Sequence, residues 1–495
     1  MEKYIMAIDQ GTTSSRVILF DQSSNMVAIA QKEVETLYPH PGWVEQSAED
    51  IWSSVVAVIF EALAKANLTL EQIAAIGITN QRETTVIWDK KTGKPVYQAL
   101  VWQSRQTAKL CEEKIEAGLQ STIQNKTGLR IDPYFSASKI RWILDAIEDG
   151  QERAERGELL FGTIDSWLVY RLTGKQVHVT DVSNASRTLL MDLKKLQWDE
   201  ELCTIWNIPK GILPEIKNTA EVYGTTDSAI FGKSVPIASI VGDQQAALFG
   251  QTCFKQGDVK NTYGTGCFML MNIGDKIIQS KHGLLTTVAW RINNQVTYAL
   301  EGSVFVAGAA VQWLRDGIKL IQTSAESEDL ATSIVDSDGV VVVPSFVGLG
   351  TPYWQQNVKG AMFGLTRGTT EKQIVRATLE SLAYQSYDVL KAMEQDTGLS
   401  ITTLQVDGGA SNNNFLMQWQ ANVLQTSIHR PCINETTALG AAYLAGLAVG
   451  YWKDYKEIQQ NWQEDQSFQP NKSKEEMKPY LDNWKKAIEA TCKFQ

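Results

Sequence analysis

The sequence predicts an α/β protein of two large domains, each built on a mixed β-sheet. The first observation is length, because 495 residues exceed what one compact core accommodates and suggest two to three domains. The second is the order near the start of the chain, where two short apolar runs precede a helical segment and a further apolar run. The third is that a similar order returns in the second half.

The first predicted element is a β-hairpin. The apolar runs at 4–8 and 16–20 have the composition of buried strands, and "DQGTTSS" at 9–15 has turn chemistry. A hairpin needs only about two to five connecting residues, so seven small polar residues would leave N–H and hydroxyl groups facing outward without internal partners. Such a loop can hold a phosphate group. A long polar hairpin without a ligand is the alternative.

A helix and a strand follow, and the same kinds of element return later. Apolar residues recur at helical spacing over 51–63, and "IAAIGIT" is typical of a strand. In the second half, "VKNTYGTGCFMLMNIG" has two apolar runs around a small-residue turn, 284–302 contains another pair, and a long helix is predicted over 304–321. We interpret this as a remote internal duplication. A boundary after "GDQQAALFG" gives predicted domains at 1–250 and 251–495.

Composition indicates a globular protein that acts on a small molecule. Hydrophobic content of 43% and charged content of 21% are ordinary, and a net charge of -10 argues against a general surface for nucleic acid or anionic membrane. The six cysteines form no CxxC pair and the four histidines lie far apart, which argues against a zinc site or disulfide scaffold. Without a signal peptide or an apolar run of about 18 residues, we expect a cytoplasmic protein with no membrane insertion.

Three glycine-rich turns are candidates for nucleotide binding. They are "DQGTTSS", "YGTG" at 263–266 and "DGGASNNNF" at 407–415, and each follows a strand-like run. Each alone is more often structural. Together they would supply phosphate contacts from two domains and a loop on the adenosine side. Other nucleotide motifs are absent, because Asp227 stands where a P-loop needs glycine in "DSAIFGKS" and no GxGxxG turn follows the first strand.

Several segments together resemble those of one enzyme family. They are "DQGTTSSR", "GITNQRETT", "DPYFSASKIRWIL", "GDQQAALFG", "NTYGTGCFML", "DGGASNNNF" and "GAMFGLTRGTTEKQIVRATLE". Over nearly its whole length, the chain resembles the FGGY family of carbohydrate kinases. The resemblance implies two ribonuclease-H-like domains of the actin-type ATPase fold with a catalytic cleft between them. It also implies ATP-dependent, Mg²⁺-assisted phosphorylation of glycerol to sn-glycerol 3-phosphate.

The resemblance further implies which residues bind ATP and the metal ion. Asp9 and Asp243 would hold Mg²⁺, which prefers oxygen ligands, although Asp9 could instead cap its turn. The positions that match the family's ATP-binding residues are Thr12, Thr13, Ser14, Arg16, Thr265, Gly308, Gln312, Gly409 and Asn413.

The acceptor is expected to contact charged, amide and aromatic side chains. The matching positions are Arg82, Glu83, Trp102, Tyr134, Asp243, Gln244 and Phe268. Charged and amide groups can bind the three hydroxyls of glycerol while the rings of Trp102 and Phe268 cover its carbons. Without the family, Arg82 and Glu83 would be interpreted as a surface ion pair and the two aromatic residues as core.

Asp243 is the candidate general base. A hydroxyl that attacks the γ-phosphoryl group must lose a proton, and a nearby carboxylate can accept it. The alternative is that Asp243 only caps the following helix.

One loop departs from the pattern of some bacterial relatives. They carry a histidine after "EVYG" whose phosphorylation by the sugar phosphotransferase system raises activity, whereas Ala229 occupies that position here. We therefore expect no activation by the phosphocarrier, and we expect a homo-oligomer, either dimer or tetramer.

Two other functions stay open: an FGGY kinase for another polyol or a sugar such as xylulose, and an actin-like ATPase without a small acceptor.

Overall fold

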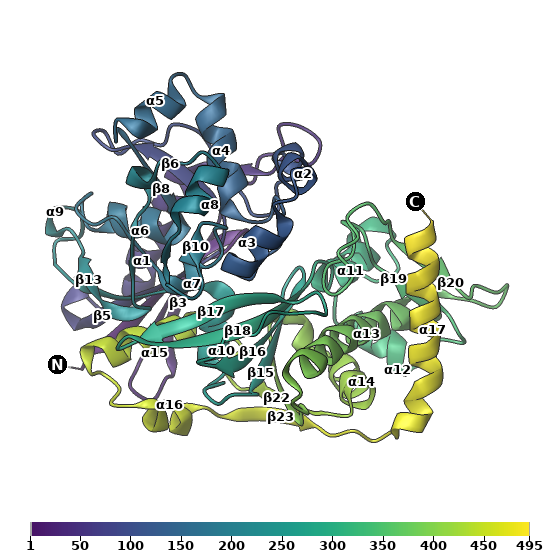
Figure 1. The fold of residues 1–495 in the computed structure, drawn as a ribbon. Coiled ribbons are helices and arrows are strands. Elements are labelled where there is room, and N and C mark those ends of the chain that lie inside the picture. The colour runs from purple at the N-terminus through teal and green to yellow at the C-terminus, as the bar shows by residue number, and fades with distance from the viewer. Residues whose placement is uncertain (1, 495) are drawn as a thin grey trace.

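A 13-stranded mixed sheet runs through both halves of the protein (Figure 1). The structure, a computed structural model, describes residues 2–494. The two parts of the sheet meet where β13 pairs with β17 at Ala220 and Ile292. In spatial order the strands are β23(Glu464–Phe468), β22(Ser427–Pro431), β21(Thr403–Asp407), β15(Val259–Tyr263), β16(Cys267–Gly274), β18(Gln295–Val304), β17(Leu285–Ile292), β13(Ala220–Thr225), β14(Pro236–Gly242), β5(Ile73–Asn80), β1(Tyr4–Gln10), β2(Ser14–Phe20) and β3(Met26–Glu33).

The two parts of the sheet repeat one strand pattern. In the first, β1 pairs antiparallel with β2 and β2 with β3, while β5 runs parallel to β1 and β14 parallel to β5. In the second, β15 pairs antiparallel with β16 and β16 with β18, while β21 runs parallel to β15 and β22 parallel to β21. The predicted internal duplication is therefore confirmed in the topology. The domain boundary after residue 250 stays a prediction.

The predicted helix near the start of the chain is confirmed and begins slightly earlier. Helix α1(Ala48–Ala66) starts after Ser47, whose side chain accepts a hydrogen bond from the Asp50 N–H, and ends at Asn67 in the left-handed conformation. Its buried face packs mainly against β3 and β2, and also contacts β1. The main helices of the second half are α13(Glu371–Thr397), α14(Asn414–Leu424), α15(Thr436–Val449) and α17(Lys474–Lys493). None of the helices within residues 2–494 combines the length and hydrophobicity that crossing a membrane requires.

Glycines allow α10(Asp243–Gly250) and α15 to cross at very short range. A Cβ atom on Gly440 would lie 1.8 Å from the Ala246 carbonyl oxygen, and one on Gly250 would lie 2.0 Å from that of Thr436. Helix α15 also packs on β1, β5 and β14 of the first half. This crossing sets the position of the first residues of α10, which follow β14 directly.

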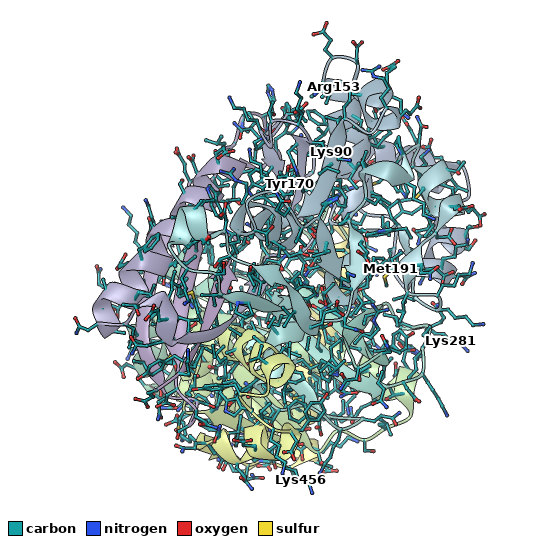
Figure 2. The ribbon with its side chains drawn as sticks, turned by 90° about the vertical axis from the view of Figure 1, so that its left-hand side faces the viewer. Lys90, Arg153, Tyr170, Met191, Lys281 and Lys456 are labelled. Atoms are coloured by element: carbon teal, nitrogen blue, oxygen red, sulfur yellow. The ribbon has the colours of Figure 1, made fainter. Side chains whose placement is uncertain are left out.

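A smaller, four-stranded sheet carries most of the remaining elements of the first half. Its order is β4(Glu45–Gln46), β7(Ala99–Leu100), β6(Thr85–Asp89) and β8(Leu159–Thr163). Figure 2 shows Lys90, Arg153 and Tyr170 together in this part of the protein. The Tyr170 hydroxyl donates to the Lys90 carbonyl (3.3 Å), and Arg153 forms an ion pair with Asp89 (3.0 Å). These contacts attach the helices that contain Arg153 and Tyr170 to the end of β6.

The remaining elements are short. The helices are α2(Ala108–Glu116), α3(Gln120–Thr127), α4(Ser136–Ala146), α5(Gly150–Glu155), α6(Ile164–Leu172), α7(Val182–Ala185), α8(Glu200–Ile205), α9(Ser228–Phe231), α11(Gly308–Gln312), α12(Glu326–Thr332) and α16(Tyr455–Asn461). The strands are β9(Val179–Asp181), β10(Met191–Asp192), β11(Gln197–Trp198), β12(Glu215–Lys217), β19(Val341–Val343) and β20(Ala361–Phe363). The 3₁₀ turns are η1(Leu70–Gln72), η2(Lys210–Ile212) and η4(Gly409–Asn412).

The first loop is shorter than predicted. The hairpin itself is confirmed, but the ladder continues through Asp9 paired with Arg16 and Gln10 paired with Ser15, so the connection is only 11–13. Backbone pairing does not depend on apolar side chains, and the Ser15 hydroxyl is bound inside the protein to that of Ser54 (2.7 Å). The expectation of seven outward-facing residues was therefore wrong.

The long helix predicted over 304–321 was also wrong. Val304 ends β18, and the helical part consists of α11 followed by a π-helical turn at Trp313–Gly317. The Ala307 and Ala309 N–H groups donate to the Thr265 carbonyl, which attaches the start of α11 to the turn between β15 and β16. This tertiary contact overrides the helical pattern of the sequence.

Candidate functional site

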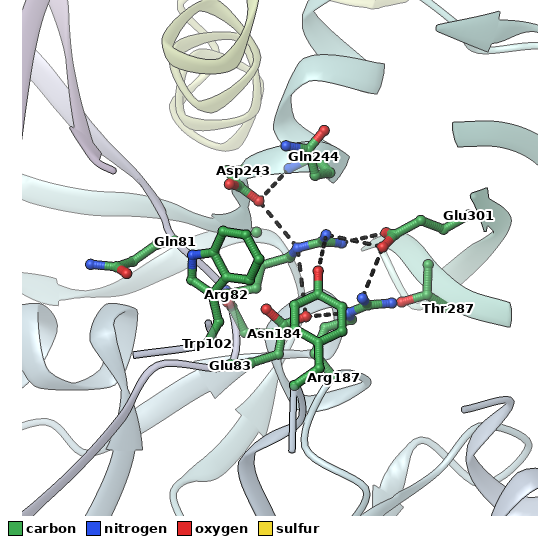
Figure 3. Close-up of polar contacts among 12 residues, drawn as sticks. Gln81, Arg82, Glu83, Trp102, Asn184, Arg187, Asp243, Gln244, Thr287 and Glu301 are labelled. Carbon is green, nitrogen blue, oxygen red and sulfur yellow. Dashed lines mark hydrogen bonds and ion pairs between the residues drawn. The ribbon is translucent and has the colours of Figure 1, made fainter. Parts of the chain in front are cut away.

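The candidate site lies where the neighbouring parallel strands β1, β5 and β14 end. Asp9 is near the end of β1, "QRE" at 81–83 follows β5, and Asp243 follows β14. Because the carboxyl ends of parallel strands share one edge, these side chains converge, which is the usual position of ligands in α/β sheets. Figure 3 shows the resulting group of charged side chains.

Arg82 connects the first half of the chain to the second. Its two Nη groups bind both carboxylate oxygens of Glu301 on β18, at 2.6 Å to Oε2 and 3.1 Å to Oε1. Its Nε lies 3.1 Å from Asp243 Oδ1 (Figure 3). Its Nη2 donates to the Tyr134 hydroxyl at 3.3 Å. One buried guanidinium therefore orients groups from three separate segments.

A second buried arginine completes the network. The Nε of Arg187, which follows α7, donates to Glu83 Oε1 at 2.6 Å, and its Nη2 donates to Glu301 Oε1 at 2.9 Å. Its guanidinium also lies over the rings of Tyr134 and Phe135. Two arginines and two glutamates thus alternate in a network whose side chains are at most 2% exposed.

The charges in this network respond differently to burial. Burial alone would raise the pKa of Glu301, but Arg187 and Arg82 lower it to about 2. Burial raises the pKa of Glu83 above its ordinary value, although Arg187 and Arg82 oppose the shift. Glu301 is therefore the permanent negative charge that both arginines share.

Glu83 has an unusual backbone conformation. Its φ of +60° lies in the left-handed region, which is uncommon for a residue other than glycine and is often found at functional sites. The Glu83 carbonyl accepts hydrogen bonds from the hydroxyls of Thr85 and Ser136, both at 3.0 Å. These contacts hold the turn between β5 and β6 so that both Arg82 and Glu83 are buried. The surface ion pair that local sequence favours is therefore wrong.

Aromatic residues from both halves lie beside the charged network. The ring of Trp102 packs edge-on against Tyr134 (5.5 Å between centroids) and against Phe268 of β16 (6.2 Å). Trp102 Nε1 donates to the Thr12 hydroxyl at 2.8 Å, so this residue also contacts the turn between β1 and β2. The residues predicted for the acceptor are therefore gathered at one place, next to one of the predicted phosphate turns.

Residues of the first predicted phosphate turn differ in exposure. Thr13 is exposed and Thr12 half-buried, whereas Ser14 begins β2 and is buried. Arg16 on the same strand forms an ion pair with Glu435, next to the start of α15. Arg16 is thus held against the second half of the chain.

The other predicted turns belong to the second half. Gly308 donates its N–H to the Gly264 carbonyl at 3.0 Å, and a Cβ on Gly308 would lie 2.5 Å from that oxygen, so only glycine fits beside Thr265. Gly409 and Gln312 are exposed. Asn413 caps α14, accepting from the Leu416 N–H, and donates to the Ser327 hydroxyl. Its side chain is therefore occupied within the second half.

Asp9 and Asp243 form an electrostatic environment that suits a cation. Burial raises the pKa of Asp9 to about 7; Arg16 opposes the shift, while Glu435 and Asp243 add to it. Burial also raises the pKa of Asp243, opposed by Arg82, the Gln244 N–H and Lys260. Within residues 2–494 no group of three or more His, Cys, Asp or Glu side chains could hold a metal by itself. Two carboxylates fit Mg²⁺, which usually takes one or two of them together with phosphates and water.

Sequence reasoning missed Arg187, Glu301 and Lys260. Glu301 lies in the strand segment "TYALEGSV" and Lys260 in "DVKNTY", and both charged side chains are fully buried. Because a buried charge needs a partner, a charge inside a strand-like run was the available signal.

Family models and known proteins agree on the assignment of the chain. The N-terminal domain model of the FGGY family of carbohydrate kinases matches residues 4–250, and the C-terminal domain model matches 259–449. The chain belongs to this family.

Members of the FGGY family similar to this kinase include proteins named glycerol kinase. Those of Geobacillus sp. (strain WCH70) and Bacillus licheniformis are 59% and 58% identical to it over 496 residues, which cover 100% of each chain. A crystal structure of Plasmodium falciparum glycerol kinase with ADP has a TM-score of 0.92 and 36% identity, covering 99% of this chain and 98% of that one. The predicted family and its two-domain, actin-type α/β fold are confirmed.

The site generates a prediction about stability. Changing Glu301 to glutamine removes the negative charge that Arg82 and Arg187 share, and breaking a buried pair typically costs about 3–5 kcal/mol. We expect Glu301→Gln to melt several degrees earlier than the unchanged chain in circular dichroism. Because the pKa of Glu301 is lowered on folding, its contribution is present above the unfolded pKa, so the difference should be constant from pH 8 to pH 6.

A matched control is the exposed ion pair between Lys478 and Asp482, 2.8 Å apart. Exposed pairs typically contribute about 0–1 kcal/mol, so Asp482→Asn should barely change the melting temperature. Equal melting temperatures of Glu301→Gln and Asp482→Asn would contradict the importance of the buried network.

Proposed function

We propose that this kinase transfers the γ-phosphoryl group of ATP to glycerol and forms sn-glycerol 3-phosphate. The observation that carries the proposal is the grouping of Arg82, Glu83 and Asp243 beside the rings of Trp102 and Phe268, next to a candidate phosphate turn. Relatives 58–59% identical over the full length and named glycerol kinase support the same acceptor. An actin-like ATPase would have no use for this group of residues.

The acceptor site suits a small polyol. Carboxylate and guanidinium groups can bind several hydroxyls at once, while the edge-on rings of Trp102, Tyr134 and Phe268 offer an apolar surface to a short carbon chain. Arg82 already binds Glu301 through both Nη groups, so its remaining N–H directions are restricted. A site held this rigidly favours one acceptor geometry.

We propose that Asp243 is the general base and acts through its Oδ2 atom. The other oxygen, Oδ1, forms an ion pair with Arg82 Nε at 3.1 Å and accepts a hydrogen bond from the Gln244 N–H at 2.7 Å. No hydrogen bond to Oδ2 from the described residues is present, and the Asp243 side chain is 30% exposed whereas that of Arg82 is 2% exposed. We propose that Oδ2 accepts the proton from the attacking hydroxyl, while Oδ1 stays bound to the protein.

The nucleotide is proposed to lie between the turns of the two halves. Thr12 and Thr13 would contact the phosphates from the first half, and Thr265, Gly308 and the loop at 407–415 from the second. Mg²⁺ held by Asp9 and Asp243 would neutralise charge on the phosphates when bound. We also propose a cytoplasmic location, where ATP is available, and a homo-oligomer; cell fractionation and light scattering would test these two points.

The decisive experiment measures ATP consumption with a panel of polyols and sugars. We expect turnover that depends on added glycerol and exceeds that with xylulose, because the acceptor site suits a short polyol. Faster turnover with another polyol or sugar would favour that acceptor instead. Equal turnover with and without glycerol would reject an acceptor-dependent kinase altogether.

Asp243→Asn should lower kcat strongly. The change keeps an oxygen for the Arg82 and Gln244 N–H groups but removes the proton acceptor, and losing a general base typically costs about 10²–10⁴ in rate. ATP binding, measured by titration, and the circular dichroism spectrum should be retained. A variant that melts earlier yet keeps near-normal kcat would instead support a helix-capping role.

The control for this variant is another aspartate at a helix start. Asp227 caps α9 by accepting the Ala229 N–H at 2.9 Å. Asp227→Asn should leave kcat unchanged.

We also propose that the phosphocarrier of the sugar phosphotransferase system does not activate this kinase. Ala229 is exposed on α9 but has no nitrogen to accept a phosphoryl group. Incubation with the carrier, its upstream kinase and phosphoenolpyruvate should leave the intact mass and the turnover unchanged. Phosphorylation of any histidine together with faster turnover would refute this expectation.

A further inference from the structure

Lys260 on β15 is a fully buried cation that no part of the proposed chemistry uses. Its ammonium group donates to Gln244 Oε1 at 2.5 Å, to the Thr262 hydroxyl at 2.8 Å and to the Phe268 carbonyl at 3.2 Å. An ammonium group has three N–H donors, so these contacts satisfy all of them. Two of the three partners, Gln244 and Phe268, are residues proposed to contact the acceptor.

The contact with Lys260 determines which way the Gln244 amide faces. An ammonium group can only donate, so the amide atom beside it must be the oxygen, and the NH₂ group must lie on the other side. No hydrogen bond from Gln244 Nε2 to another described residue is present, and Gln244 is 8% exposed. Gln244 directly follows Asp243 at the start of α10, beside the proposed base (Figure 3).

We propose that Lys260 is a positioning residue that turns the Gln244 amide so that its NH₂ group donates a hydrogen bond to an acceptor hydroxyl. This inference rests on the proposed function. Gln244 thereby selects acceptors with a hydroxyl oxygen at one position, and an analogue without that hydroxyl leaves the NH₂ group unpaired. Through the Phe268 carbonyl, the same lysine holds the backbone of the ring that packs against Trp102.

The surroundings of Lys260 support a positioning role over simple packing. Burying a lysine is costly, and an apolar side chain would fill the same space more cheaply. Burial lowers the pKa of Lys260 to about 8, while Asp407, Asp243 and Glu301 favour its charged form, so it is largely protonated at pH 7. Lys260 belongs to the second half of the chain, and its ammonium group contacts α10 of the first half.

The sharpest test is Gln244→Glu, which replaces the NH₂ group by an oxygen of similar size. A carboxylate oxygen still accepts the hydrogen bond from Lys260, so the variant should fold normally. The donor is lost, so the KM for glycerol should rise about 10–100-fold, as expected for a lost hydrogen bond. The KM for ATP should stay within twofold. An unchanged KM for glycerol would overturn the donor role of Gln244.

A second variant tests the lysine itself. In Lys260→Met, the Gln244 amide is free to rotate, so discrimination between glycerol and a diol should weaken. For each diol, 1,2-propanediol and 1,3-propanediol, we compare kcat/KM for glycerol with kcat/KM for the diol. For the diol that lacks the hydroxyl bound by Gln244, we expect this ratio to fall about tenfold. Unchanged ratios for both diols would overturn the positioning role. A purely structural loss lowers kcat/KM for glycerol and for the diols by the same factor, so it leaves the ratios unchanged.

The control variant is Lys126→Met, which removes a half-buried lysine that binds Asp199 and Glu201 away from the site. It should leave both ratios unchanged. The protein without substitutions tests the proposed function separately from this inference. If its turnover does not depend on glycerol, the proposed function is rejected before any variant is compared.

Discussion

The contact between Arg82 and Glu301 is the interaction on which the rest of the site depends. Glu301 binds both Nη groups of Arg82 and also receives Arg187. A guanidinium group is planar, so once both Nη groups are bound, the direction of its Nε–H is determined. Arg82 Nε then lies 3.1 Å from Asp243 Oδ1, with which it forms an ion pair. The orientation of the proposed base in the first half is therefore set by a carboxylate in the second.

The same arrangement occurs twice at the start of α10. Arg82 holds Asp243, and Lys260 holds the next residue, Gln244. Buried charged contacts contribute little net stability, because desolvation offsets most of the attraction. Their contribution here is geometric, since each buried cation leaves one atom of its partner free to face the acceptor. The two neighbouring residues thus offer a proton acceptor and a hydrogen-bond donor.

The repeated strand pattern explains why both halves supply a phosphate turn. The turn between β1 and β2 and that between β15 and β16 occupy equivalent places in the two repeats. The close crossing of α10 and α15, which glycines allow, joins the two repeats beside the site. Phosphoryl transfer depends mostly on positioning and charge neutralisation. A site built from two mutually braced halves meets that requirement.

The sequence alone determined the strands of the hairpin, helix α1, the three glycine-rich turns and the place of Asp243 between a strand and a helix. These features depend on side-chain periodicity and turn residues within a few positions of each other. Only the tertiary structure decided that Arg82 and Glu83 are buried, because the partner Glu301 lies 219 residues from Arg82. It also shortened the first loop and moved the start of the helix predicted over 304–321 to Gly308, where the Ala307 and Ala309 N–H groups bind the Thr265 carbonyl. Local patterns carry no information about such distant partners, so the network that orients Asp243 and Gln244 became visible only in the folded chain.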